Sequence, residues 1–276
     1  MTASQTTLAR HPPRRQRQHL RLLLRPAATP AMMTAIPVMT VVIPAMMIDR
    51  TPLTFRHEYK HLLSSPEDRI LSARLGRLFP RDSHAGPEGT YRVYSLYFDT
   101  PDDRALRQKL DGTDSREKFR LRYYGNSPAF LRLEKKIKKG GLCAKRQARL
   151  TPEQGRFLLE GNTDFLLQSQ DPLLIEFYSK LQGQLLSPRT VVCYEREAFL
   201  HPAGNVRITL DRHICTGISW RNFFSPEILE RSVDPGRTVL EVKYDAFLPD
   251  IVRMAVQTPG RTTCAYSKYA ACRRSD

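Results

Sequence analysis

Basic side chains recur at every second position in several separate segments of this 276-residue chain. The clearest segment reads REKFRLRY and carries four cations two residues apart, Arg116, Lys118, Arg120 and Arg122. Successive side chains of a β-strand point to opposite faces, so these four cations share one face of an expected strand. Like charges at this spacing repel one another, and a protein tolerates that mainly where an anion binds. The pattern therefore predicts a sheet with one anion-binding face.

Eight segments with this alternation are spread along the chain. They are residues 55–60, 91–99, 116–123 and 131–138, a segment around 145–146, another around 193–196, and residues 206–211 and 240–245. Eight antiparallel strands are enough to close a barrel that encloses a small ligand. We therefore predict an α+β fold built on a closed eight-stranded antiparallel β-barrel, a tunnel with a charged lumen that is flanked by helices.

Helix start signals lie between these segments. Each consists of a capping residue followed by proline, and in three of them an acidic residue follows in the first turn. The four signals begin at Ser65, Thr100, Thr151 and Asp171. The apolar residues that follow predict helices packed against the outside of the barrel.

Residues 1–50 have a different composition, with seven Arg, one Asp and neither Gly nor Glu. Their apolar part is interrupted by Pro30, Pro37 and Pro44, which a lone membrane-spanning helix does not tolerate. We interpret residues 1–50 as a disordered or spuriously translated leader, with a targeting segment as the alternative. Residues 51–276 are then one domain.

The chain has 44 Lys and Arg residues against 28 Asp and Glu residues, a formal charge of +16. Such an excess indicates an anionic partner: nucleic acid, a membrane surface or a phosphorylated small molecule. A nucleic-acid interface would expose basic residues together with stacking aromatic residues. Here the basic residues alternate toward one shared face, so we expect no nucleic-acid partner.

Nine short motifs occur along the chain in a fixed order. They are Arg56-x-Glu58-x-Lys60, Ser95-Leu96-Tyr97-Phe98-Asp99, Arg116-x-Lys118-x-Arg120-x-Arg122-x-Tyr124-Gly125, Leu133-Glu134-x-Lys136, Lys145-Arg146, Tyr194-x-Arg196, Arg207-x-Thr209-x-Asp211, Leu240-Glu241-x-Lys243-Tyr244 and Ser267-Lys268-Tyr269. Together they resemble the VTC domain, the polyphosphate polymerase domain of vacuolar transporter chaperone proteins and their bacterial relatives. This domain belongs to the triphosphate tunnel metalloenzyme superfamily. The resemblance covers about residues 52–272 and implies an eight-stranded antiparallel tunnel.

The resemblance also implies a reaction, the transfer of the ATP γ-phosphate to a growing polyphosphate chain with Mn²⁺ or Mg²⁺. The residues that it implies are catalytic (Lys60, Arg120, Arg122, Lys136, Arg196 and Lys268), substrate-binding (Arg56, Glu58, Lys118, Glu134, Lys145, Arg146, Arg207, Lys243 and Ser267) and metal-binding (Glu241). Arginine suits bidentate phosphate binding, whereas lysine acts as a point charge. We expect Glu58, Glu134 and Asp211 to pair with Arg and Lys in the lumen rather than to bind metal.

Two other functions remain open at this point. A triphosphate hydrolase on the same fold would use water in place of the acceptor phosphate, and a non-catalytic module would bind polyphosphate or inositol phosphates. Five cysteines without a C-x-x-C spacing argue against a disulfide framework and favour a reducing compartment. We therefore expect a cytoplasmic protein that would need a separate membrane protein to move its product across a membrane.

Overall fold

The computed structural model describes residues 52–275, with the exception of residues 259 and 261. The predicted leader, residues 1–50, lies outside the described residues, and its interpretation stays a prediction.

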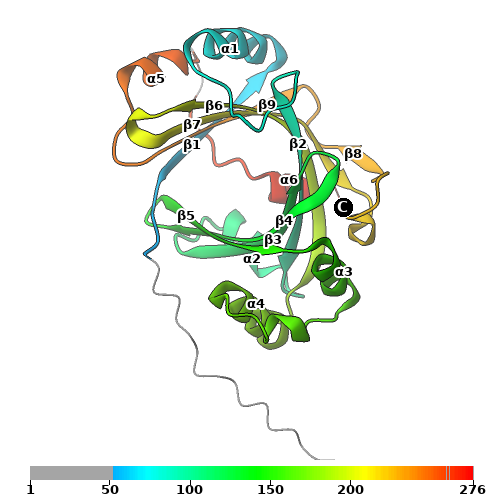
Figure 1. The fold of residues 1–276 in the computed structure, drawn as a ribbon. Coiled ribbons are helices and arrows are strands. Elements are labelled where there is room, and N and C mark those ends of the chain that lie inside the picture. Colours follow the sequence, from blue (N-terminus) through cyan, green and yellow to red (C-terminus); the bar gives the residue numbers. More distant parts are fainter. Residues whose placement is uncertain (1–51, 259, 261, 276) are drawn as a thin grey trace, which may run out of the picture. The chain divides into compact units, whose positions relative to one another are not determined.

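Nine strands form one antiparallel sheet in the described part of the chain (Figure 1). They are β1 (His57–Ser64), β2 (Thr90–Asp99), β3 (Arg116–Tyr124), β4 (Ser127–Lys139), β5 (Leu142–Leu150), β6 (Ser187–His201), β7 (Val206–Gly217), β8 (Glu230–Ser232) and β9 (Arg237–Tyr244). Their order is β1-β9-β7-β6-β2-β3-β4-β5, and the short β8 pairs with β7. The eight predicted segments coincide with the eight long strands, which confirms the antiparallel α+β prediction.

The two strands at the ends of this order, β1 and β5, meet at a single bridge among the described residues. Arg56, which precedes β1, and Cys143 of β5 exchange two backbone hydrogen bonds of 2.9 Å. No ladder continues from this bridge along the described strands. Strand pairing therefore shows a curved sheet with a seam between β1 and β5, and it does not establish the closed eight-stranded barrel that we predicted.

Six helices accompany the sheet within the described residues. They are α1 (Ser65–Leu78), α2 (Arg104–Leu110), α3 (Pro152–Glu160), α4 (Pro172–Gly183), α5 (Asp250–Ala255) and α6 (Lys268–Arg273). In Figure 1, α1 and α5 cover the outer side of the sheet near β7 and β9, whereas α3 and α4 cover the outer side near β4. Separate hydrophobic clusters fill these two outer layers. The short α6 lies on the inner side, where it contacts β6 and β7.

The predicted helix starts are confirmed at Thr151 and Asp171, whose side chains accept hydrogen bonds from backbone N–H groups of the first turn. The start predicted at Ser65 is shifted by one residue, because the backbone N–H and hydroxyl of Ser64 both donate to Glu67. The start predicted at Thr100 is wrong. Residues 100–103 form a turn, and α2 begins only at Arg104.

Within the described residues, no helix combines the length and the apolar character that crossing a membrane would require.

Candidate functional site

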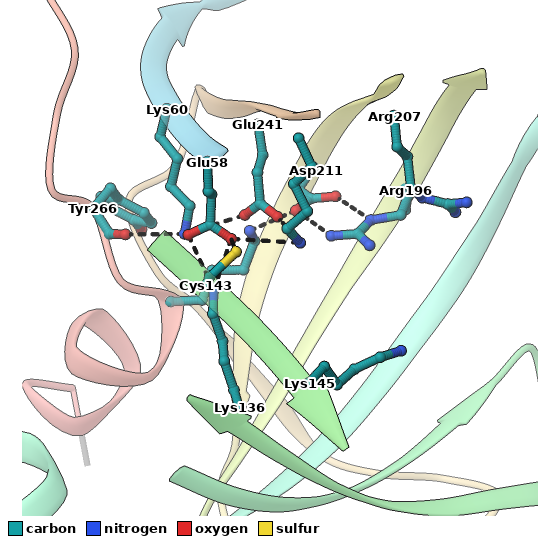
Figure 2. Close-up of polar contacts among 12 residues, drawn as sticks. Glu58, Lys60, Lys136, Cys143, Lys145, Arg196, Arg207, Asp211, Glu241 and Tyr266 are labelled. Atoms are coloured by element: carbon teal, nitrogen blue, oxygen red, sulfur yellow. Dashed lines mark hydrogen bonds and ion pairs between the residues drawn. The ribbon is translucent and has the colours of Figure 1, made fainter. Parts of the chain in front are cut away.

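Two glutamates and three lysines gather where β1, β9 and β4 face one another (Figure 2). Lys60 Nζ lies 3.4 Å from the carboxylate of Glu58 and 3.1 Å from that of Glu241. Lys243 forms an ion pair with Glu241 and lies 3.5 Å from Glu58, and Lys136 Nζ lies 2.8 Å from Glu58. We call these five residues the lysine–glutamate cluster. Because β1 and β4 are not neighbours in the sheet order, the contact between Glu58 and Lys136 shows that the sheet curves round.

Both carboxylates of this cluster are ionised at neutral pH. Burial acts to raise the pKa of both carboxyls, and the charge of Glu241 also acts to raise that of Glu58. The lysines outweigh these effects and hold the pKa of Glu58 and Glu241 well below the ordinary range. Conversely, the two carboxylates raise the pKa of the buried Lys60 despite its desolvation. The cluster is therefore a set of fixed charges.

A second group of charges lies on β3 and β4. Arg120 donates from Nε and Nη2 to the same oxygen of Glu134, at 2.8 and 2.6 Å, and from Nη1 to the hydroxyl of Tyr97 at 2.7 Å. Arg122 lies 3.5 Å from that oxygen and donates to Ser95 at 2.9 Å. Glu134 is completely buried, and although burial acts to raise its pKa, the two arginines hold it well below the ordinary range. The carboxylate thus fixes both guanidinium groups toward the interior.

A third group links β6, β7 and α6. Arg196 forms a bidentate ion pair with Asp211 at 2.6 and 2.8 Å, and Lys268 Nζ lies 2.5 Å from the same carboxylate. Asp211 is completely buried, which acts to raise its pKa, but the two cations lower it to about 2. Ser267 begins α6 by accepting a hydrogen bond from the Ala270 N–H at 3.3 Å. The expected pairing of Asp211, Glu134 and Glu58 with basic residues is therefore present.

The predicted pair of Lys145 and Arg146 is separated by the alternation of β5. Lys145 lies on the inner face, with its Nζ 3.4 Å from Glu134. Arg146 is the next residue, so its side chain belongs to the opposite face, beside the start of α4. We leave Arg146 out of the proposed site for this reason.

Arg56 and Arg207 bind acidic residues at one end of the interior. Arg56 Nε donates to Asp245 at 2.6 Å. Arg207 Nη2 donates to Asp82 at 2.5 Å and to the hydroxyl of Tyr91 at 2.8 Å. Arg207 is opposite Lys243 of the lysine–glutamate cluster in the register of β7 and β9. A phosphate would have to compete with the carboxylate partners of both arginines.

Sequence reasoning missed the hydroxyl groups that orient the inner arginines. Ser95 and Tyr97 of β2 contact Arg122 and Arg120, and Tyr194 of β6 accepts from Arg122 at 3.1 Å. The alternation of residues 91–99 places Ser95 and Tyr97 on one face, which is the signal that could have identified them. Their partners follow from the strand register, which pairs Ser95 with Arg122 and Tyr97 with Arg120.

The carboxylates of the lysine–glutamate cluster fit a divalent cation. Glu58 and Glu241 both direct an oxygen toward the ammonium of Lys60, so they already converge on a positive charge. Thr209, which is paired with Glu241 in the register of β7 and β9, has a buried hydroxyl without a hydrogen-bond partner among the described residues. Mg²⁺ binds through one or two carboxylates together with phosphate oxygens and water. Because the described residues contain no group of three or more His, Cys, Asp or Glu ligands, substrate oxygens would complete the coordination.

Lys118 predicts a pH dependence of stability. Its ammonium lies 4.7 Å from the ring centre of Tyr269, and burial together with Lys136 and Arg116 lowers its pKa from 10.5 to about 7. Between these two values the unfolded chain binds more protons than the folded protein, so the free energy of unfolding rises with pH. Lys118→Met should therefore raise the melting temperature at neutral pH, and this gain should shrink as the pH approaches 10.5. Thermal unfolding of both proteins across this range measures the gain, and a gain that is independent of pH would contradict the assignment.

Comparison with known proteins identifies a family and a fold. The family described as VTC domain matches residues 55–275. No curated protein sequence matches the chain significantly. Among solved structures, a putative adenylyl cyclase from Hippeastrum, which is described as having a dominant triphosphatase activity, is similar with a TM-score of 0.50 and 15% identity, over 80% of this chain and 96% of that chain. A putative adenylate cyclase from Bacillus halodurans has a TM-score of 0.44 and 15% identity, over 69% of this chain and 81% of that chain. A protein described as an inorganic triphosphatase has a TM-score of 0.31 and 14% identity, over 78% of this chain and 96% of that chain.

At 15% identity, the likeness to the Hippeastrum protein shows a shared fold and nothing further. The family match is of a different kind, because it extends over most of the chain and includes every strand of the sheet. This chain belongs to the VTC domain family and has the fold of the triphosphate tunnel metalloenzymes.

Proposed function

We propose that this protein is a polyphosphate polymerase, which transfers the γ-phosphate of ATP to a growing polyphosphate chain in its charged interior. The observation that carries the proposal is the meeting of three charge groups, from β1 and β9, from β3 and β4, and from β6 and α6, on one inner face. Membership of the VTC domain family supports the choice of polyphosphate as the product.

The interior is proposed to be a tunnel. Two contacts across the seam support this, the backbone bridge between Arg56 and Cys143 and the ion pair between Glu58 and Lys136. The first joins β1 to β5, and the second joins β1 to β4. A polyphosphate chain enclosed in this way would be surrounded by charged side chains that come from both ends of the sheet order.

The proposed mechanism needs no covalent chemistry from the protein. The attacking group is an ionised terminal phosphate oxygen, so the protein contributes positioning and charge neutralisation. Arg120, Arg122 and Arg196 would bind phosphate oxygens, and their carboxylate and hydroxyl partners already fix the guanidinium groups before substrate enters. Such fixed dipoles and charges require little rearrangement when negative charge develops during transfer.

Glu241 is the residue that would hold the metal. We expected Glu58 to pair with basic residues rather than to bind metal, but it would join Glu241 because its carboxylate also faces Lys60. A divalent cation at these carboxylates would act as a Lewis acid that withdraws charge from the phosphate oxygens. Lys60, Lys136 and Lys243 would remain close to the same oxygens, because they contact the same two glutamates. The lysines then bind and orient the phosphates on either side of the transferred group.

A triphosphate hydrolase is the second candidate. The Hippeastrum protein of the same fold, which is described as having a dominant triphosphatase activity, is the observation that favours it. The same charged interior would serve both reactions, since water would only replace the acceptor phosphate. Incubation of the protein with ATP and Mn²⁺, followed by gel electrophoresis, separates the two candidates. A ladder of polyphosphate supports the polymerase, and release of the γ-phosphate as orthophosphate, with ADP and without polymer, supports the hydrolase.

Tripolyphosphate should stabilise the protein more strongly than sodium chloride of equal ionic strength. A ligand that binds only the folded state at a hundred times its dissociation constant raises the free energy of unfolding by about 2.7 kcal/mol. Salt alone screens the buried charges little. Thermal unfolding in the two solutions measures the difference, and equal melting temperatures would mean that the inner cations do not bind phosphate.

A further inference from the structure

Four cations lie together where β3 begins and where α2 and β4 end. They are Lys109, Arg116, Lys118 and Lys138, and we call them the α2–β3 patch. All four are half-buried. The strand register sets Arg116 opposite Lys138 and, on the same face, Lys118 opposite Lys136. Directly opposed like charges destabilise an antiparallel pair of strands. Two consecutive pairs of this kind therefore mark a place where the empty protein is electrostatically unfavourable.

Carboxylates balance the α2–β3 patch only in part, because Asp99 favours the charged form of Lys118 without forming an ion pair with it. None of its four cations forms an ion pair with a carboxylate of the described residues, in contrast to Lys60, Arg120 and Arg196 deeper in the interior. Asp114, two residues before Arg116, instead accepts hydrogen bonds from the backbone of Gly140 and Gly141.

Glu117 lies between two cations of the patch in sequence but points to the other face of β3. There it forms ion pairs with Lys135 and Lys180 at 2.8 and 2.6 Å. The neighbours of Lys109 are mainly cations, since Arg116, Lys60 and Lys138 all act with burial to lower its pKa.

The patch continues directly from the lysine–glutamate cluster. Lys118 is opposite Lys136, and Lys136 in turn contacts Glu58 at 2.8 Å. A line of basic side chains therefore leads from the proposed metal site to the edge of the interior.

We propose that the α2–β3 patch binds the distal phosphates of a polyphosphate chain whose reacting end lies at the lysine–glutamate cluster. The inference rests on the proposed function and specifies its substrate as a chain longer than triphosphate. A polyphosphate carries negative charge at every unit, which matches a line of basic side chains that, beyond Lys136, form no ion pair with a carboxylate of the described residues. A long chain whose reacting end lies at the cluster would contact more of the patch than a triphosphate does, so we expect the patch to discriminate between chain lengths.

The test compares two double variants of the full chain. In Lys109→Gln/Lys138→Gln, one basic residue of the patch on α2 and one on β4 lose their charge. The matched control is Arg107→Gln/Lys139→Gln, which removes the same charge from the same two elements. Lys139 is exposed and alternates to the other face of β4, and Arg107 lies 3.8 Å from Asp102 at the surface. Isothermal titration with long-chain polyphosphate and with tripolyphosphate, at one ionic strength, gives the two affinities of each protein.

The patch variant should bind the long chain about tenfold more weakly than wild type, since each lost ion pair of a partly exposed lysine is worth about a few-fold in affinity. Its affinity for tripolyphosphate should stay within about twofold, and the control should keep both affinities. Lys138→Arg should keep the long-chain affinity, which excludes a loss through misfolding. Equal weakening for both ligands, or no weakening for either, would overturn the proposal. So would a single-stranded oligonucleotide that binds as tightly as the long chain and with the same dependence on the patch.

Turnover of ATP, measured on the same proteins, separates this proposal from the proposed function. A wild-type protein that binds long chains through the patch but forms no polymer would reject the polymerase and keep the patch. A wild-type protein that forms polymer, while the patch variant binds long chains normally, would reject the patch and keep the polymerase.

Discussion

Glu241→Gln should lower metal-dependent turnover of ATP by orders of magnitude and leave the binding of metal-free polyphosphate intact or tighter. The amide keeps the shape of the side chain but removes the charge that would retain the metal. It also leaves Lys60 and Lys243 with one carboxylate fewer, which makes the site more attractive to an anion. Turnover with Mn²⁺ and binding in the presence of a chelator measure the two effects separately.

Glu117→Gln is the matched control for this variant. Glu117 also forms ion pairs with two lysines, Lys135 and Lys180, but on the outer face of the sheet. Its replacement should leave turnover unchanged, although it removes the same charge. Normal turnover by Glu241→Gln would refute the metal assignment.

Arg122→Ala and Arg120→Ala should both weaken tripolyphosphate binding and turnover by about 10- to 100-fold, because each hydrogen-bonded charge is worth about 1.5–3 kcal/mol. Arg120→Ala should also be less stable than Arg122→Ala. Without Arg120, the completely buried Glu134 keeps only Arg122 and Lys145, at 3.5 and 3.4 Å. Removing one partner of a buried ion pair lowers the free energy of unfolding by about 3–5 kcal/mol.

Adding Glu134→Gln to Arg120→Ala should therefore recover much of the lost stability without restoring binding. Thermal unfolding and titration with tripolyphosphate measure the two properties. If the double variant recovered binding as well, Arg120 would act only by neutralising Glu134, and its assignment as a phosphate ligand would be wrong.

The strands and their inner face could be predicted because alternation is a local property of the sequence. The register confirms that Lys118 and Lys136 share a face, as the period of two requires. The same rule would have separated Lys145 from Arg146, but the resemblance to the family placed them together. The start of α2 was mispredicted because Asp99 and Thr100 accept hydrogen bonds from Ala105 and Arg104, which moves the first helical residue away from the proline.

The contacts that assemble the interior could not be predicted, because they join residues far apart in sequence. Tyr269 of α6 donates to Asp99 at 2.6 Å, and Lys268 contacts Asp211. Neither pairing has a local signature, and both depend on where α6 packs. The seam between β1 and β5 is of the same kind, since alternation shows which residues share a face but not which strands meet.

Acidic residues balance the deep cations of the interior. Glu58, Glu134, Asp211 and Glu241 balance the deep cations, so that the guanidinium and ammonium groups are held in place before a ligand binds. The excess of positive charge lies instead at the α2–β3 patch. A site of fixed charges followed by an unbalanced line of cations suits a reaction in which one end of a long polyanion is extended.

The ratio of orthophosphate to ADP formed from ATP and Mn²⁺ tests the proposed polymerase most directly. Transfer to a polyphosphate chain releases ADP without orthophosphate, so this ratio should stay close to zero while the γ-phosphate label enters acid-precipitable polymer. Equal amounts of orthophosphate and ADP, with no label in polymer, would contradict the polymerase.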